Sequence, residues 1–354
     1  METVMDINIT KVERSKLNDL NLENIPFGKY FSDHMLEADY ENGEWKNVEI
    51  KPYQPMVFEP SLAALHYGQS IFEGIKGYKD AKGEAYIFRP YDNFVRFNLS
   101  AERLCMPTVP EEIFMDGMKQ LVALDKNWIP FRENHSLYIR PLMFATDTLL
   151  GVRPSDTYKF MIMLSPSGPY YTSPMKIAVE KNYTRAVKGG VGFSKNAGNY
   201  ANSMLAAKEA KEKGYDQVLW TDGFEHKWLQ EVGMMNIMFI IDGVAVTPDI
   251  SEGTVLNGVT RNSIIVMLQE MGFKVEQRKI SIDEIVEAYK KGTLQEVFGC
   301  GTAATIAPIA ELGYGDFRMP FDIDGFKTAI ALRKHFDDIR YSRVPDTHGW
   351  MVKI

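Results

Sequence analysis

The amino-acid sequence predicts a mixed α/β (α+β) protein built from two domains. The chain has 354 residues, which is enough for two domains with separate hydrophobic cores. Patterns typical of strands and of helices are mixed along both halves, and they include a hairpin, which favours α+β or mixed α/β domains over one doubly wound sheet. A segment rich in proline and without periodicity separates the two halves.

In the first half, a short strand-like run precedes a helix, a second helix follows, and two longer strands close the half. The second helix begins at Pro110, a residue favoured in a first helical turn, and acidic Glu111 and Glu112 follow where the helix dipole favours them. The other expected elements are a strand at Tyr86–Phe88, a helix at Tyr91–Leu104, and strands at Ser136–Phe144 and Tyr158–Leu164.

The segment Ser165–Pro174, SPSGPYYTSP, contains three prolines and one glycine and has no hydrophobic periodicity. It is therefore the best candidate for an interdomain linker. The sequence thus predicts a first domain over residues 1–164, a linker over 165–174 and a second domain over 175–354.

Local signals in the second half mark where helices and strands begin and end. Ser281 and Glu284 form a capping box that opens a helix ending near Gly292. Asp242-Gly243 between two apolar runs is a strong hairpin signal. The expected strands are Met175–Glu180, Gln217–Thr221, Asn236–Ile241 and Val244–Thr247, and the expected helices are Asn202–Lys213, Asn262–Glu270 and Asp324–Ile339.

The composition favours a protein that acts on small molecules. The formal net charge of −7 gives no basic field for nucleic acid or anionic lipid, and no apolar run is long enough to span a membrane. The two cysteines, Cys105 and Cys300, are too far apart for a CxxC zinc site or a disulfide framework, and the N-terminus does not have the pattern of a targeting peptide. We therefore expect a cytoplasmic protein without a metal site.

A glycine-rich segment around Lys195, KGGVGFSKNAGNY, is the first candidate for chemistry. A lysine becomes a covalent catalyst when its amine is neutral, and small neighbours leave room for a planar aldehyde. Most lysines, however, are simply solvated. A phosphate loop of the Walker type is excluded here because it needs glycine before the lysine and Ser or Thr after it, whereas Ser194 and Asn196 occupy these positions.

Glu231, in LQEVGMMN, is the second candidate. An acidic residue next to a strand is usually solvated. If its carboxylate is buried instead, it could keep a pyridine nitrogen protonated, which would stabilise a carbanion at the substrate α-carbon.

Two glycine-containing turns are candidates for binding anions. In NGVTR, Gly258 lets the backbone approach a ligand, and the amides of Val259 and Thr260 lie where a helix N-terminus presents free N–H groups. An ordinary capped helix is about equally consistent with this pattern. In FGCGTAA, Thr302 offers a hydroxyl and Ala303 an amide, although this pattern alone is weak.

Tyr138 and Arg140 lie two residues apart in the strand SLYIRP and therefore point to one face of it. A phenol beside a guanidinium fork suits a carboxylate, although a structural ion pair would also explain the arginine.

These segments, taken in order, resemble the motifs of one enzyme family. ALHYGQSIFEGIKGY, SLYIRP, LSPSGPY, the Lys195 segment ending GNYANS, QEVGMMN, NGVTRNS and FGCGTAA are similar to the successive motifs of the branched-chain amino-acid aminotransferases. These are class IV aminotransferases with the fold-type IV architecture of pyridoxal-phosphate enzymes. The resemblance runs from about Phe31 to the C-terminus. It implies a smaller N-terminal α/β domain and a larger C-terminal pseudo-barrel domain.

The resemblance also implies the roles of individual residues. Lys195 would hold pyridoxal 5'-phosphate in a Schiff base and move the proton during transfer, Glu231 would pair with the pyridine nitrogen, and Tyr200 would hydrogen-bond the phenolic oxygen. The phosphate would be held by Arg96, Val259, Thr260 and Thr302. Substrate carboxylates would meet Tyr138, Arg140 and Ala303, and the apolar pocket would be walled by Phe31, Tyr67 and Phe72.

The implied reaction is reversible transfer of the amino group of L-leucine, L-isoleucine or L-valine to 2-oxoglutarate. In the family, the segment matching Leu150–Val152 is lent by the neighbouring subunit, which implies a homodimer with shared sites and a role for Val152. Arg140 would also let one pocket accept the γ-carboxylate of glutamate.

Two departures from the family pattern stand out. Ala304 and Ala307 occupy the positions of a CxxC found in mammalian relatives, so we expect no thiol switch of that kind, and Met234 stands where several relatives have Thr. The alternatives are a D-amino-acid aminotransferase or an aminodeoxychorismate lyase of the same fold, or a non-catalytic protein that binds a nucleotide or metabolite.

Overall fold

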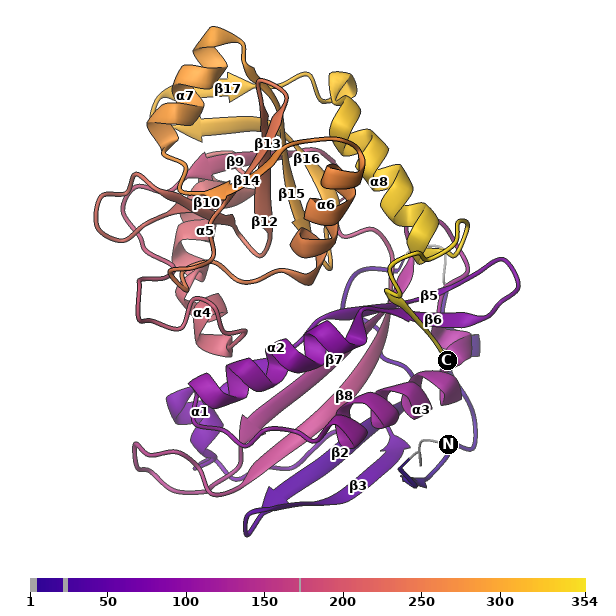
Figure 1. Cartoon of the computed structure of the whole chain (residues 1–354). Helices are drawn as coiled ribbons and strands as arrows, with labels where there is room; N and C mark the ends of the chain where they lie inside the picture. Colours follow the sequence, from indigo (N-terminus) through magenta and orange to yellow (C-terminus); the bar gives the residue numbers. More distant parts are fainter. Residues whose placement is uncertain (1–4, 22–24, 172) are drawn as a thin grey trace. The chain divides into compact units, whose positions relative to one another are not determined.

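The computed structural model describes residues 5–21, 25–171 and 173–354 of the chain (Figure 1). The chain divides into two compact units. The first contains residues 1–170, 194–198 and 338–354, and the second contains residues 171–193 and 199–337. The first unit thus takes in two segments from the second half of the sequence, residues 194–198 and 338–354, whereas the predicted first domain is one continuous range.

The first unit is built on a nine-stranded sheet with the order β1-β3-β2-β8-β7-β5-β6-β18, in which β4 also pairs with β7. All of its strand pairs are antiparallel except β1 with β3. Its strands are β1 (Asn8–Ile9), β2 (His34–Glu41), β3 (Glu44–Pro52), β4 (Ser70–Phe72), β5 (Ile75–Lys79), β6 (Ala85–Phe88), β7 (Ser136–Ala145), β8 (Tyr158–Ser167) and β18 (Met351–Lys353).

Helices α2 (Pro90–Arg103) and α3 (Gly117–Leu124) cover one face of this sheet (Figure 1), and the short α1 (Ala63–Tyr67) precedes β4. A π-helical turn, Glu112–Asp116, leads into α3. The rings of Phe97, Phe114 and Phe160 pack between the helices and the sheet with centroids 5.4 to 5.8 Å apart. Each such aromatic pair contributes about 0.5–1.5 kcal/mol beyond the burial of its area.

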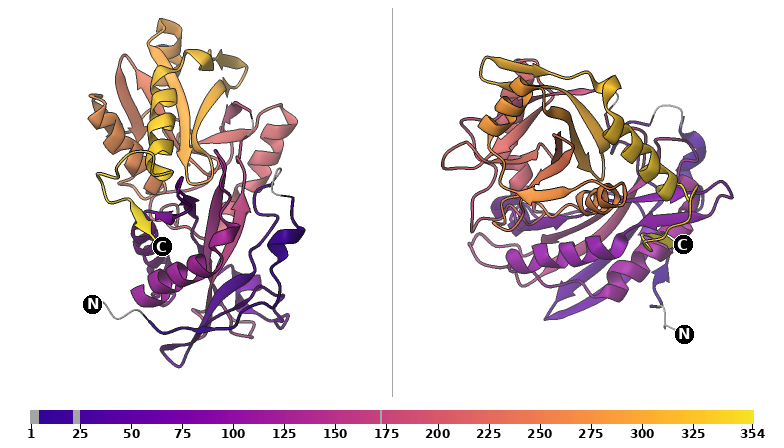
Figure 2. Two further views of the ribbon diagram at one scale, coloured as in Figure 1. Left: turned by 90° about the vertical axis from the view of Figure 1, so that its right-hand side faces the viewer. Right: turned by 45° about the horizontal axis from the view of Figure 1, so that its top comes forward.

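The second unit contains another nine-stranded sheet, with the order β11-β10-β9-β16-β15-β12-β13-β14 and with β17 paired to β16. The strands curl around an apolar interior, as the right-hand view of Figure 2 shows. They are β9 (Met175–Val179), β10 (Gln217–Thr221), β11 (Leu229–Val232), β12 (Asn236–Ile241), β13 (Val244–Pro248), β14 (Val275–Arg278), β15 (Leu294–Gly301), β16 (Thr305–Tyr314) and β17 (Phe317–Pro320).

The helices of the second half are α4 (Ala197–Asn202), α5 (Met204–Glu212), α6 (Val259–Glu270), α7 (Ile282–Lys291) and α8 (Lys327–Arg340). Buried Glu296 on β15 accepts hydrogen bonds from the first amides of α8, those of Thr328 and Ala329, at 2.7 and 2.8 Å. Within residues 5–21, 25–171 and 173–354, no helix is long and apolar enough to cross a membrane.

The mixed α/β class is confirmed, and most of the predicted elements are present. The Ser281 hydroxyl accepts from the Glu284 amide at 3.1 Å, as a capping box requires. Asp242 and Gly243 both have positive φ, which is the backbone of a type I′ hairpin turn. The predicted Asn202–Lys213 helix is present as α5, which begins two residues later at Met204, and the short α4 before it was not predicted.

The predicted linker also differs in part. Residues 165–167 complete β8, where they pair with the first residues of β7. Thr172 of the predicted linker lies outside the described residues. Whether the two units fold as separate domains stays a prediction.

Candidate active site

Lys195 lies in the short segment 194–198, which two elements of the first unit hold by its backbone. The Lys195 amide donates to the Ser100 hydroxyl of α2 at 2.9 Å, and the Lys195 carbonyl accepts from the Phe72 amide of β4 at 3.0 Å. The half-buried side chain places its Nζ 4.9 Å from the centroid of the Phe72 ring. The position of the amine is therefore set by contacts with residues that lie far away in the sequence.

Phe72 also contacts Arg140, one member of the predicted carboxylate-binding pair Tyr138 and Arg140. The Arg140 guanidinium carbon lies 4.5 Å from the centroid of the Phe72 ring, and Arg140 Nη2 donates to the Tyr138 hydroxyl at 3.0 Å. Among the described residues, the buried Arg140 Nε has no hydrogen-bond partner. The alternative that Arg140 serves in a structural ion pair therefore has no support among the described residues. Its Nε–H group can donate to a ligand.

Gly74 makes room for this arrangement. A Cβ atom on Gly74 would overlap the Tyr138 hydroxyl and would lie 2.9 Å from its ring carbon Cζ, which is closer than non-bonded atoms approach. Any other residue would therefore push the Tyr138 side chain out of its place beside Arg140.

Arg96, on α2, faces a carboxylate that sequence reasoning missed. Arg96 Nε and Nη2 donate to the two carboxylate oxygens of Glu73 at 2.7 and 2.8 Å, and both residues are buried. This bidentate geometry fixes the plane of the guanidinium. Glu73 lies in the segment ALHYGQSIFEGIKGY, but nothing in the local pattern indicated Arg96 as its partner.

Glu231 lies on β11 of the second unit and is buried, so the alternative of a solvated carboxylate is wrong. One carboxylate oxygen accepts from the Leu256 amide at 2.9 Å, and the other lies 3.3 Å from Arg185 Nη1. Arg185 is itself buried and also donates to the carbonyls of Gly192 and Thr254. No local pattern indicated Arg185, because its partners lie in three separate loops and strands.

The N-terminus of α6 has the features expected of an anion site. Its N-cap, Gly258, provides no side-chain cap, and Val259 and Thr260 in the first turn are buried. A Cβ on Gly258 would overlap Asn236 Oδ1, while Asn236 Nδ2 donates to the Leu256 carbonyl at 2.9 Å. The glycine is therefore required for the helix to start where it does.

The remaining predicted residues are less closely grouped. Thr302 and Ala303 lie in the turn after β15 and are half-buried, and Tyr200 is half-buried in α4. The Phe31 ring stacks on Tyr53 with centroids 4.8 Å apart. Two others are exposed at the surface of the chain, namely Tyr67 and Val152, at 41% and 89%.

Comparison with known proteins supplies the family. The model of the family "Amino-transferase class IV" matches residues 70–312. A probable branched-chain-amino-acid aminotransferase of Staphylococcus epidermidis is 48% identical over 94% of both chains, and branched-chain-amino-acid aminotransferase 2 of Bacillus subtilis is 45% identical over 99% of this chain and 96% of its own. The chain belongs to the branched-chain-amino-acid aminotransferases. The resemblance drawn from the motifs is therefore confirmed.

Solved structures of the same family share the fold of this aminotransferase. The enzyme of Escherichia coli matches with a TM-score of 0.70 at 25% identity, over 90% of this chain and 98% of its own. The T.th. enzyme, complexed with N-(5'-phosphopyridoxyl)-L-glutamate, matches with a TM-score of 0.69 at 29% identity, over 89% of this chain and 97% of its own. These matches confirm the fold-type IV architecture.

Pyridoxal 5'-phosphate is the cofactor of this family, and residues of the described chain fit it. Lys195 supplies an amine beside an aromatic ring, and Glu231 supplies a buried carboxylate. The start of α6 lacks a side-chain cap and has a glycine at a position where a Cβ would collide with Asn236. These are the groups that an aldehyde, a pyridine nitrogen and a phosphate each require.

We expect Gly258→Ala to weaken the binding of pyridoxal phosphate about tenfold, because the added Cβ must displace either Asn236 or the first turn of α6. The dissociation constant can be measured by the quenching of tryptophan fluorescence as the apoenzyme is titrated with the cofactor. Gly325→Ala is the matched control, since a Cβ there meets its nearest atom at an ordinary 3.5 Å. Equal dissociation constants for both variants and the natural protein would contradict this account of the α6 terminus.

Proposed function

We propose that this chain catalyses the reversible transfer of the amino group of L-leucine, L-isoleucine or L-valine to 2-oxoglutarate. The products are the branched-chain 2-oxo acid and L-glutamate. The observation that carries the proposal is the grouping of Lys195, Arg140 and Tyr138 around Phe72. It places an amine and a guanidinium 4.9 and 4.5 Å from the centroid of one ring, and the guanidinium Nε has no hydrogen-bond partner among the described residues. Relatives of 45–48% identity with this name support the choice of substrates.

In this proposal, different residues of the chain hold different parts of the cofactor. Lys195 would form the covalent link, Glu231 would pair with the pyridine nitrogen, and Tyr200 would hydrogen-bond the phenolic oxygen. Arg96, Val259, Thr260 and Thr302 would hold the phosphate. When bound, the cofactor supplies an aldehyde and an electron-withdrawing ring that stabilises negative charge at the substrate α-carbon.

The other steps belong to the side chains. The Lys195 amine would move the proton between the substrate α-carbon and the cofactor, away from the α-carbon of the donor in one half of the reaction and onto the α-carbon of the product amino acid in the other. Arg185 and the Leu256 amide hold the Glu231 carboxylate in one orientation, so that it does not reorganise as charge develops.

We also propose that one pocket accepts both substrate classes. Tyr138, Arg140 and Ala303 receive carboxylates, and the apolar walls come from Phe31, Tyr67, Phe72 and Val152. A guanidinium over an aromatic ring suits this dual role, because its N–H edge can pair with a second carboxylate while the ring faces an apolar side chain.

We expect Arg140→Ala to lower kcat/KM about 100-fold with L-glutamate as donor but only about tenfold with L-leucine, because glutamate loses a charge-assisted contact at a second carboxylate. The measurement is a pair of steady-state assays with the two donors. Arg14→Ala is the control, since Arg14 forms an exposed ion pair with Asp19 far from these residues in the sequence. An equal loss with both donors would exclude the special role of Arg140.

A homodimer with shared sites is part of the proposal. It is supported by large apolar side chains that the isolated chain exposes, among them Leu65 and Leu150 at 71% and Val152 at 89%. A cytoplasmic location is also proposed, and the free cysteines Cys105 and Cys300 are consistent with a reducing compartment.

A donor panel tests the function directly. Holoenzyme is assayed with 2-oxoglutarate and either L-leucine or D-alanine, and separately with aminodeoxychorismate. We expect turnover of L-leucine only. Preferred use of D-alanine, or release of pyruvate from aminodeoxychorismate, would replace the proposed function with one of the two alternatives of the same fold.

A further inference from the structure

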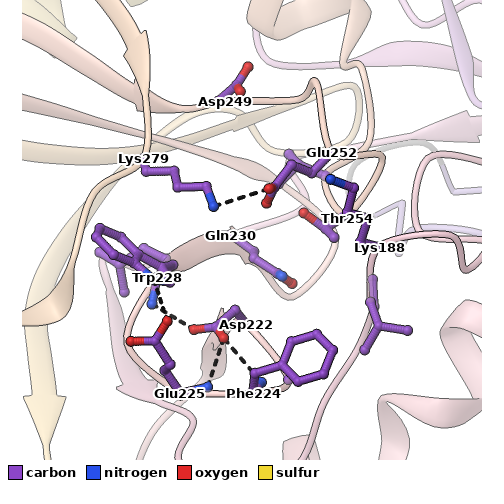
Figure 3. A pocket seen from close by; sticks show the side chains of 15 residues that line it. Lys188, Asp222, Phe224, Glu225, Trp228, Gln230, Asp249, Glu252, Thr254 and Lys279 are labelled. Carbon is purple, nitrogen blue, oxygen red and sulfur yellow. Dashed lines mark hydrogen bonds and ion pairs between the residues drawn. The ribbon is translucent and has the colours of Figure 1, made fainter.

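A cavity of about 270 Å³ lies in the second unit (Figure 3). None of the residues that line it is assigned above to the cofactor or the substrate. Its walls come from residues 186–188, 222–225 and 228–230, from four residues between 249 and 255, and from Lys279. The volume is slightly below the range typical of pockets for drug-sized ligands. It therefore suits a smaller molecule.

Gln230 indicates that the cavity is a binding site and not only a surface hollow. The residue is 4% exposed, and its Oε1 is buried without a hydrogen-bond partner among the described residues. Figure 3 shows its amide end within the ring of labelled side chains. An unpaired buried acceptor is costly, so a glutamine in this place calls for an N–H or O–H donor from a ligand.

The charges around the cavity restrict the class of ligand. Four carboxylates line it (Asp222, Glu225, Asp249 and Glu252) but only two ammonium groups (Lys188 and Lys279). This excess disfavours a phosphate or another plain anion. In the described part of the chain, no group of His, Cys, Asp or Glu side chains could hold a metal ion.

Several of the charged groups are already engaged. The Asp222 carboxylate accepts four backbone N–H bonds, from Phe224, Glu225, Lys227 and Trp228, and so shapes the loop. Lys279 Nζ lies 3.1 Å from Glu252 Oε1. Lys188 has an exposed side chain at the rim, where it can meet the anionic end of a ligand. Trp228 adds an aromatic wall.

We propose that this cavity binds a free α-amino acid, with the ligand ammonium donating to Gln230 Oε1, its carboxylate at Lys188 and its side chain against Trp228. A zwitterion matches a site with both signs of charge and an orphaned acceptor. The site lies on the opposite face of β11 from Glu231, because Gln230 and Glu231 are consecutive strand residues. If the proposed function holds, a ligand bound here contacts β11, the strand that also carries Glu231, and can therefore change transamination activity.

Calorimetry on the holoenzyme tests the site without turnover. Reduction with borohydride first stops the reaction, and the enzyme is then titrated with L-leucine. Gln230→Leu keeps the side-chain volume but removes the amide, and Gln269→Leu, at an exposed position on α6, is the matched control. We expect one binding component in the natural enzyme and in Gln269→Leu that weakens about tenfold or more in Gln230→Leu.

Lys188→Ala provides a second variant that does not disturb buried structure, and we expect it to weaken the same component about three- to tenfold. Two analogues of leucine that carry one charge each, 4-methylpentanoate and 3-methylbutylamine, should not produce this component. Identical isotherms for the natural enzyme and both variants would overturn the site. Equally tight binding of either analogue would overturn the assignment to amino acids. Neither result bears on transamination, which the donor panel measures separately.

Discussion

Lys195→Ala should lose transamination between L-leucine and 2-oxoglutarate by about 10⁴-fold or more. Proton transfer by a positioned side chain contributes about 10²–10⁴-fold by itself, and this variant also loses the covalent link to the cofactor. The loss should appear in kcat, since the groups proposed to hold the phosphate and the substrate carboxylates remain. Single-turnover absorbance measurements would separate slow chemistry from weak binding.

Lys208→Ala is the matched control for this variant. Lys208 lies on α5 with an exposed side chain, which forms a surface ion pair with Glu212 at 3.8 Å. Its replacement should leave kcat unchanged. Comparable activity of Lys195→Ala and Lys208→Ala would remove Lys195 from the mechanism.

The second large effect is expected on stability. Arg185→Met should lower the free energy of unfolding by about 3–5 kcal/mol, because it leaves the buried Glu231 carboxylate without its ion-pair partner. It also leaves the carbonyls of Gly192 and Thr254 without a buried donor. Urea denaturation of the apoenzyme, followed by tryptophan fluorescence, measures the change.

A double variant tests the cause of this effect. Replacing Glu231 by Gln in the Arg185→Met background removes the uncompensated charge, so it should restore part of the lost stability. Lys291→Met is the control for a surface pair, Lys291 with Glu287, and should change the stability by at most about 0.5 kcal/mol. A loss of that small size in Arg185→Met would show that the Arg185–Glu231 contact contributes little.

Most helices, but fewer than half of the strands that the structure describes, were predicted from the sequence, and those that were predicted have local signals. Three such signals act within a few residues, and all are present in the structure. They are the capping box at Ser281, the Asp242-Gly243 hairpin turn, and Pro110 before the helix that leads into α3. The predicted helix from Asn202 is present as α5, whereas the short α4 before it was missed, because its six residues, AGNYAN, have no apolar periodicity.

The candidate site was predictable only in part. Motif order identified the family, and the strand spacing of Tyr138 and Arg140 correctly placed them side by side. The partners Glu73, Ser100 and Arg185 were missed, because each contact joins residues 23 to 95 positions apart for which the local sequence has no pattern. Such pairings depend on the register of the strands and the packing of α2, which only the fold supplies.

Borohydride reduction of the holoenzyme, followed by peptide mapping, tests the central claim most directly. Reduction makes the bond between the cofactor and the enzyme permanent, so mass spectrometry can identify the modified residue. We predict a single phosphopyridoxyl group on Lys195, in the peptide that contains residues 194–198. A label on any other lysine, or none on a holoenzyme that is active with L-leucine, would contradict the account.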